Sequence, residues 1–177
     1  MRFSKGMAIG LALVMMLMTS AALASTTGTT GIFSYDVPAG FTATENFDEQ
    51  TKVFQLTLVS DDGTLTLGFL AAQYPQFEGL DLTAADDDDL PGILAVMEID
   101  ADALGLTVEL VSDMDEETGE VYAYIALYDD NDSENHMINI DVEGWIEYEA
   151  MARTNGPLTD ADYDLFFEFY NSIIINE

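Results

Sequence analysis

Two strands joined by a tight turn are the feature that most constrains the fold of this 177-residue chain. Apolar residues alternate with polar residues over positions 53–60 and again over positions 64–71. This period of two gives each strand one face suited to a hydrophobic core. Asp61-Asp62-Gly63 separates the two segments and is typical of a hairpin connection. The sequence therefore predicts antiparallel sheet in the first half of the chain.

Five more segments have strand character, one before this hairpin and four in the second half of the chain. Their residue ranges are 32–37, 107–112, 120–128, 136–142 and 145–153. Residues 120–128 carry apolar or aromatic side chains on both faces. A strand of that kind is typically covered on both sides, so we expect it to be a central strand.

Two segments have helical spacing instead. Apolar residues recur at intervals of three, four and seven between residues 90 and 104, which predicts one helix that ends near Gly105. A second helix is predicted over residues 160–173, with Thr159 as N-cap and Asp162 three residues later. Together these elements predict an α+β fold in which helices pack on a largely antiparallel sheet of about six or seven strands.

The order of these elements and two short motifs resemble the PsbP/Mog1-like α/β sandwich family, including its bacterial secreted relatives. The first motif is Phe33-Ser34-Tyr35-Asp36-Val37-Pro38-Ala39-Gly40-Phe41, and the second runs from Phe166 to Ile173 at the end of the last helix. The resemblance implies the sandwich fold and an accessory or scaffold role. Members of the family include a photosystem extrinsic subunit and a small-GTPase-binding nuclear-import factor. The resemblance supplies no catalytic residues.

The first 24 residues are typical of a secretory signal peptide. Arg2 and Lys5 precede an apolar stretch over residues 7–18, and small residues at positions 22 and 24 fit signal-peptidase cleavage between Ala24 and Ser25. An uncleaved membrane anchor is the alternative. Residues 25–31 are small and polar and predict a flexible leader, and residues 32–177 predict a single exported domain. The chain has no Cys, so this domain has no disulfides and depends on its core.

The charge is extreme, with 34 Asp and Glu against 4 Lys and Arg and a net charge of −30. Such a surface has no basic stripe for nucleic acid, and anionic membranes repel it. A field of this sign favours partners with basic surfaces. We therefore expect a secreted, non-enzymatic module that binds a protein partner. Tyr122, Tyr124 and Trp145 are candidate contact residues for that partner.

Calcium binding is an alternative function, since hard cations bind clustered carboxylates. Asp113, Asp115 and Glu117 alternate like the first ligands of a calcium loop, although Thr118 stands where that loop needs glycine. A second acidic turn follows, with candidate ligands Asp129, Asp130, Asp132 and Glu134. A third acidic run, residues 86–89, is more simply explained by the favourable charge at a helix N-terminus.

A hydrolase centred on His136 is the third hypothesis. His136 is the sole histidine and lies beside an acidic turn, so a Ser–His–Asp arrangement is conceivable. The sequence has no Gly-x-Ser-x-Gly motif, however, and a lone histidine among many serines is expected by chance. No catalytic constellation is therefore assigned.

Overall fold

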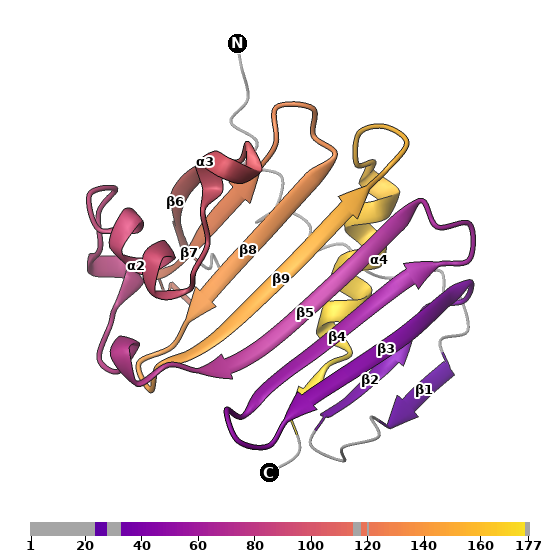
Figure 1. Ribbon diagram of the computed structural model, residues 1–177, viewed down its shortest axis with the longest axis horizontal. Coiled ribbons are helices and arrows are strands. Elements are labelled where there is room, and N and C mark those ends of the chain that lie inside the picture. Colours follow the sequence, from indigo (N-terminus) through magenta and orange to yellow (C-terminus); the bar gives the residue numbers. More distant parts are fainter. Residues whose placement is uncertain (1–23, 28–32, 115–117, 120, 176–177) are drawn as a thin grey trace.

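The computed structural model describes residues 24–27, 33–114, 118–119 and 121–175. Within these residues, seven strands form one sheet in the order β3-β4-β5-β9-β8-β7-β6 (Figure 1). Every neighbouring pair is antiparallel, and β9 is the middle strand. The strands are β3 Phe41–Asp48, β4 Val53–Ser60, β5 Leu65–Gln73, β6 Thr107–Met114, β7 Val121–Tyr128, β8 Glu134–Ile140 and β9 Trp145–Arg153.

The predicted hairpin between β4 and β5 is confirmed. Gly63, at φ +69°, donates its amide to the Ser60 carbonyl at 2.8 Å. The Asp62 carboxylate accepts from the Ser60 hydroxyl and from the Thr64 amide, which fixes the turn. The alternating apolar residues of both strands then face the same side of the sheet, where all are buried.

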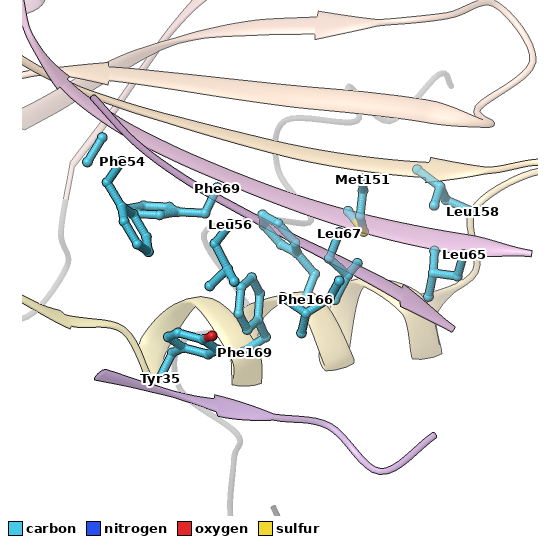
Figure 2. Packing of buried hydrophobic residues seen from close by; sticks show 12 residues of the cluster. Tyr35, Phe54, Leu56, Leu65, Leu67, Phe69, Met151, Leu158, Phe166 and Phe169 are labelled. Atoms are coloured by element: carbon cyan, nitrogen blue, oxygen red, sulfur yellow. The ribbon is translucent and has the colours of Figure 1, made fainter. Parts of the chain in front are cut away.

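One face of the sheet is covered by α4, Asp160–Asn171, which lies behind the strands in Figure 1. Thr159 caps this helix and forms the predicted capping box with Asp162. Figure 2 shows how Phe166 and Phe169 of α4 meet the side chains of β4, β5 and β9. Tyr35 of β2 (Phe33–Val37) joins the same cluster and is 2% exposed.

The opposite face is covered over β7, β8 and β9 by α2 (Leu90–Val96) and α3 (Ala101–Leu104), together with the 3-10 turns η2 (Pro75–Phe77) and η3 (Leu82–Ala84). These elements lie in front of the sheet in Figure 1. Ile125, Ile138 and Ile146 are fully buried beneath them. The sheet therefore carries helices on both faces, but over different halves. This arrangement confirms the predicted α+β class.

A second, small sheet in the order β1-β2-β10 lies beside α4 and joins the first and last strands of the described chain. Its strands are β1 Ala24–Thr27, β2 Phe33–Val37 and β10 Ile174–Ile175. Residues 25–27, predicted to belong to a flexible leader, instead pair with β2. Except for Ala24, the predicted signal peptide lies outside the described residues. None of the described helices is long and apolar enough to cross a membrane.

The structure also departs from the prediction at one helix and at one strand of the large sheet. The helix expected over residues 90–104 is two helices, because Glu98 adopts φ +59° and Asp100 caps α3 through the Ala103 amide. β3 was not predicted, because its inward side chains are only half-buried and include Glu45. The strand expected to be covered on both faces, β7, is an interior strand between β8 and the edge strand β6, and its consecutive residues 124–127 are all buried.

Candidate functional site

A hollow of about 460 Å³ opens on the surface between η2, η3 and the start of α2. We call it the η3–α2 groove, and its lining residues are Phe77, Gly79, Leu80, Asp81, Ala84, Ala85, Asp89, Gly92 and Ile93. Phe77 and Ile93 are buried and Leu80 is half-buried, so these side chains form an apolar floor. Asp81 and Asp89 are exposed and form an acidic rim.

The side of the groove that carries η2 is attached to the turn between β8 and β9. Tyr74 donates its amide to the Gly144 carbonyl at 2.8 Å, and Gly79 donates to the Val142 carbonyl at 3.0 Å. Gly144 has φ +79°, and a Cβ atom there would lie 2.6 Å from the Tyr74 carbonyl oxygen. Only glycine permits this close approach of two backbones.

Carboxylates of the rim also organise the loop that carries them. Asp81 caps η3 by accepting from the Thr83 amide at 2.9 Å and from its hydroxyl at 2.7 Å. Both hydrogen bonds hold the pKa of Asp81 below its ordinary value, and the bond from the Thr83 hydroxyl has the larger effect. Asp89 accepts from the Asp86 amide at 3.1 Å. The loop before α2 is thus folded by its own acids, and Asp87 and Asp88 remain exposed beside the rim.

No lysine or arginine of the described residues neutralises this rim. Lys52 and Arg153 are the cations of the described chain, because Arg2 and Lys5 lie in the predicted signal peptide. Lys52 lies in the turn between β3 and β4, over the ring of Phe47 at 5.9 Å. Arg153 is engaged by Asp162, with contacts of 2.5 and 3.0 Å. The negative potential of the groove is therefore uncompensated.

His136 is buried and forms a chain of hydrogen bonds with Glu134 of β8, whose side chain is 43% exposed, and Tyr148 of β9. Its Nε2 lies 2.8 Å from Glu134 Oε1, and its Nδ1 lies 2.6 Å from the Tyr148 hydroxyl. Burial lowers the pKa of His136, although Glu134 opposes that shift. Burial likewise raises the pKa of Tyr148 to about 12, with a smaller contribution from Glu134. A neutral ring therefore donates from Nε2 to Glu134 and accepts at Nδ1 from Tyr148.

This geometry leaves no ring nitrogen of His136 for a serine. A Ser–His–Asp arrangement needs one ring nitrogen at the serine hydroxyl and the other at the carboxylate. Here the position of the serine is taken by Tyr148, whose hydroxyl has a raised pKa and is a poor nucleophile. The cluster joins two strands and has the properties of a structural polar network.

A buried acid, Glu149 of β9, lies under α4, on the face of the sheet opposite to His136. It is 1% exposed. Its Oε1 accepts from the Asn139 amide at 3.2 Å, whereas its Oε2 has no hydrogen-bond partner among the described residues. Burial raises the pKa of Glu149 to about 8; the nearby Tyr170 hydroxyl, which donates to Glu147, and the Asn139 amide oppose the shift, while the charge of Glu147 adds to it. Near neutral pH this side chain is therefore largely a neutral acid.

A cavity of about 20 Å³ adjoins Glu149 between β8, β9 and α4. It is lined by Asn135, Met137, Glu149, Met151, Tyr163, Phe166 and Phe167. A space of this size holds about one water molecule. It offers room for a hydrogen-bond partner of the acid but no room for an organic substrate.

The predicted contact residues Tyr122, Tyr124 and Trp145 lie on one face of the sheet by the strand register, but they differ in exposure. Tyr122 is 41% exposed, whereas its strand neighbour Tyr124 is 4% exposed and Trp145 is half-buried. Burial raises the pKa of Tyr124 to about 12. A partner surface made by all three residues stays a prediction, and Tyr124 offers little area to it.

The two predicted calcium loops also remain predictions. Of the first, Asp113 is exposed on β6, and residues 115–117 lie outside the described residues. In the second, Asp129 accepts from the Ser133 amide and hydroxyl, both at 2.7 Å, and from the Glu134 amide at 2.9 Å. Glu134 Oε1 lies 2.8 Å from His136 Nε2. Within the described part of the chain, no three His, Cys, Asp or Glu side chains are grouped to hold a metal ion.

Two features of these sites could not be identified from sequence. The groove depends on how η2 and η3 lie against α2, and residues 74–85 have no regular hydrophobic period that would place them. Glu149 lies on the β9 face that carries mostly charged residues, so alternation alone assigns it to solvent. The acidic run at residues 86–89 is visible in the sequence, but the sequence pattern predicts only a charge cluster at a helix N-terminus.

Comparison with known proteins gives a structural match without a sequence match. No protein-family model and no curated protein matches the sequence. Among solved structures, the chain is similar to the solution structure of cyanobacterial PsbP (CyanoP) from Synechocystis sp. PCC 6803. The identity is 15% and the TM-score 0.53, with 89% of this chain and 95% of that chain covered. The chain therefore has a PsbP-like α+β fold, as its motifs predicted.

Proposed function

We propose that this chain is an exported, non-enzymatic accessory domain that binds a protein partner with a basic surface. The observation that carries the proposal is the uncompensated acidic rim beside an apolar floor in the η3–α2 groove. Surface charge of one sign steers association with oppositely charged partners and penalises wrong ones. A second copy of the chain would bring a further net charge of −30, so the favoured partner is a different, basic protein.

Two other observations support a binding role over catalysis. The one histidine is engaged at both ring nitrogens, and the cavity beside Glu149 is too small for a substrate. The resemblance to the PsbP/Mog1-like family implies an accessory or scaffold role, and the shared fold is consistent with that. Fold alone does not define function, so the proposal depends on the surface chemistry.

The proposal is tested by capture from the extracellular fluid of the organism. Chain 25–177 is immobilised at about 0.05 M salt, washed, and eluted at about 0.5 M, where exposed charges are screened over a few ångströms. We expect a basic protein to be retained at low salt and released at high salt. Direct titration of the purified partner then gives its affinity and stoichiometry. The proposal would be contradicted if no partner is recovered, or if the recovered proteins are acidic and their retention does not depend on salt concentration.

A further inference from the structure

The η3–α2 groove combines two kinds of surface within one hollow. Its volume of about 460 Å³ lies within the range of about 300–1,000 Å³ that is usual for ligand pockets. Phe77 and Ile93 are exposed by 5% and 6%, so they form the base of the hollow and do not protrude from it. Leu80 is half-buried at its side. An apolar side chain from another molecule fits such a floor.

The rim requires an occupant of opposite charge. Asp81 and Asp89 line the hollow, and Asp86, Asp87 and Asp88 follow one another beside it. These carboxylates repel one another because no described lysine or arginine lies among them. A lysine or arginine from a partner relieves that repulsion, whereas an acidic segment or a second copy of this chain adds to it.

The groove is also organised before anything binds. The Tyr74 and Gly79 amides hold its η2 side to the turn between β8 and β9, and Asp81 caps η3. Asp86 and Asp89 fix the loop before α2 through backbone amides. A prearranged surface loses little conformational entropy on binding, which favours affinity for a short segment.

We infer that the η3–α2 groove binds a basic segment of a protein partner. The segment places an apolar side chain on the floor formed by Phe77, Leu80 and Ile93, and lysine or arginine side chains beside Asp81 and Asp89. This inference rests on the proposed partner-binding function and assigns it to a particular surface. The contact is a surface interaction, with the charged groups at a solvated rim and the apolar anchor at its centre.

The test uses a defined probe, a twelve-residue peptide of three Lys-Leu-Lys-Gly repeats, and a matched peptide with Ser in place of each Leu. Binding to chain 25–177 is measured by fluorescence anisotropy, and the site is mapped by amide chemical shifts. We expect the leucine peptide to bind more tightly than the serine peptide. The shifts should concentrate on residues 77–93. Equal binding of both peptides, or shifts spread over all acidic loops, would overturn the inference.

Two variants separate the groove from general acidity. Asp87→Asn with Asp88→Asn removes two exposed charges beside the rim, and we expect about a fivefold loss of affinity, or roughly 1 kcal/mol. The control, Glu49→Gln with Asp61→Asn, removes the same charge from exposed turns at β3, β4 and β5, and should lose less than about twofold. Equal losses for the two pairs would show that the peptide senses only net charge.

The apolar floor is tested in the same way. Leu80→Ser should weaken binding of the leucine peptide by about fivefold and leave binding of the serine peptide unchanged. Leu104→Ser, at a leucine that is 65% exposed on α3, is the control. If Leu80→Ser alters the fold, shift mapping on the unmodified chain still decides the location. A captured natural partner that binds the Asp87/Asp88 variant undiminished would place the partner elsewhere and leave the proposed function intact. Peptide binding in the groove without any captured partner would support the groove as a binding site and contradict the proposed function.

Discussion

Asn139 donates its side-chain amide to one carboxylate oxygen of Glu149 at 3.2 Å, and Glu149 also lines a space with room for about one water molecule. This acid lies between the middle strand of the sheet and α4. Burial without a compensating cation favours its neutral form, which makes the stability of the packed helix depend on pH.

Replacing Glu149 with Gln should remove part of the pH dependence of stability. The folded-state pKa of Glu149, about 8, lies above its ordinary value of 4.5, so the native state binds the proton more tightly than the unfolded state. Its contribution is complete below about pH 4.5 and is lost as the pH rises to about 8, by up to about 5 kcal/mol. Urea unfolding of wild type and Glu149→Gln at pH 5 and pH 8 measures the difference.

Repulsion among surface acids also lowers the stability as the pH rises, so the comparison needs a matched control. Glu143→Gln removes an exposed carboxylate from the turn between β8 and β9. The free energy of unfolding of Glu143→Gln should decrease between pH 5 and pH 8 by as much as that of wild type. The decrease for Glu149→Gln should be much smaller. Identical losses in all three proteins would show that Glu149 is ionised in the native state without penalty.

The His136 ring should stay neutral below its usual pKa, as the Nε2-protonated tautomer. Burial outweighs the attraction of Glu134, so the folded-state pKa lies below 6.5. The free energy of unfolding then decreases as the pH falls from 6.5, because the unfolded chain gains a proton that the folded chain resists. Nitrogen NMR of the one imidazole gives both its pKa and its tautomer without assignment ambiguity.

Tyr148→Phe tests the hydrogen bond that supports this tautomer. Loss of the hydroxyl at Nδ1 leaves that nitrogen free to accept a proton, so the pKa of His136 should rise relative to wild type. Tyr128→Phe is the control, since its hydroxyl donates to Glu109 on β6 instead. A ring that titrates at 6.5 or above in wild type, or one protonated at Nδ1, would refute the assignment.

Arg153→Lys should destabilise the chain although it conserves charge. Two guanidinium nitrogens of Arg153 bind the Asp162 carboxylate, which is 4% exposed and also caps α4 through Thr159. Burial opposes ionisation of Asp162, but Arg153 and Thr159 together hold its pKa below the ordinary value. A lysine supplies one point contact in place of the fork, so we expect a loss of about 1–3 kcal/mol in urea unfolding.

The control for that substitution is Lys52→Gln, which removes the charge of an exposed cation. Its effect should stay within about 0.5 kcal/mol, as is usual for a surface substitution. A loss for Arg153→Lys no larger than that would mean that Asp162 needs only a nearby positive charge.

Gly144→Ala should destabilise the chain and displace the side of the groove that carries η2. Its Cβ atom would meet the Tyr74 carbonyl oxygen at 2.6 Å and the Glu78 amide nitrogen at 3.1 Å, and backbone atoms cannot move aside independently. Gly63→Ala isolates the cost of positive φ, about 1 kcal/mol, because nothing lies within 4 Å of that position. We expect Gly144→Ala to cost at least about 2 kcal/mol more in thermal or urea unfolding. Equal costs would contradict the close approach.

Local chemistry explains which parts of the fold were predictable. The Asp62 turn, the capping box at Thr159 and Asp162, and the alternation in β4 and β5 are all set by residues a few positions apart. These are the cases in which sequence pattern and tertiary packing favour the same conformation. Local sequence patterns do not determine the strand order, because the pairing of β5 with β9 joins segments about 80 residues apart.

The candidate sites were less predictable than the fold, for the same reason. Glu149 looks like a solvent-facing residue until α4 is laid over it. The floor of the groove needs Phe77 and Ile93, which come from different elements and meet only after both pack on the sheet. The break between α2 and α3 depends on Glu98, a residue type that gives no warning of a positive φ angle.

The middle strand serves two separate cores, since Ile146 of β9 belongs to the cluster under α2 and α3 and Met151 to the cluster under α4. Opening either half of the molecule therefore strips one face of the same strand and weakens the other half. The two halves are bound into one cooperative unit, although their helices lie on opposite sides. Amide hydrogen exchange should then be slowest along β9 and its neighbours, at the rate of global unfolding.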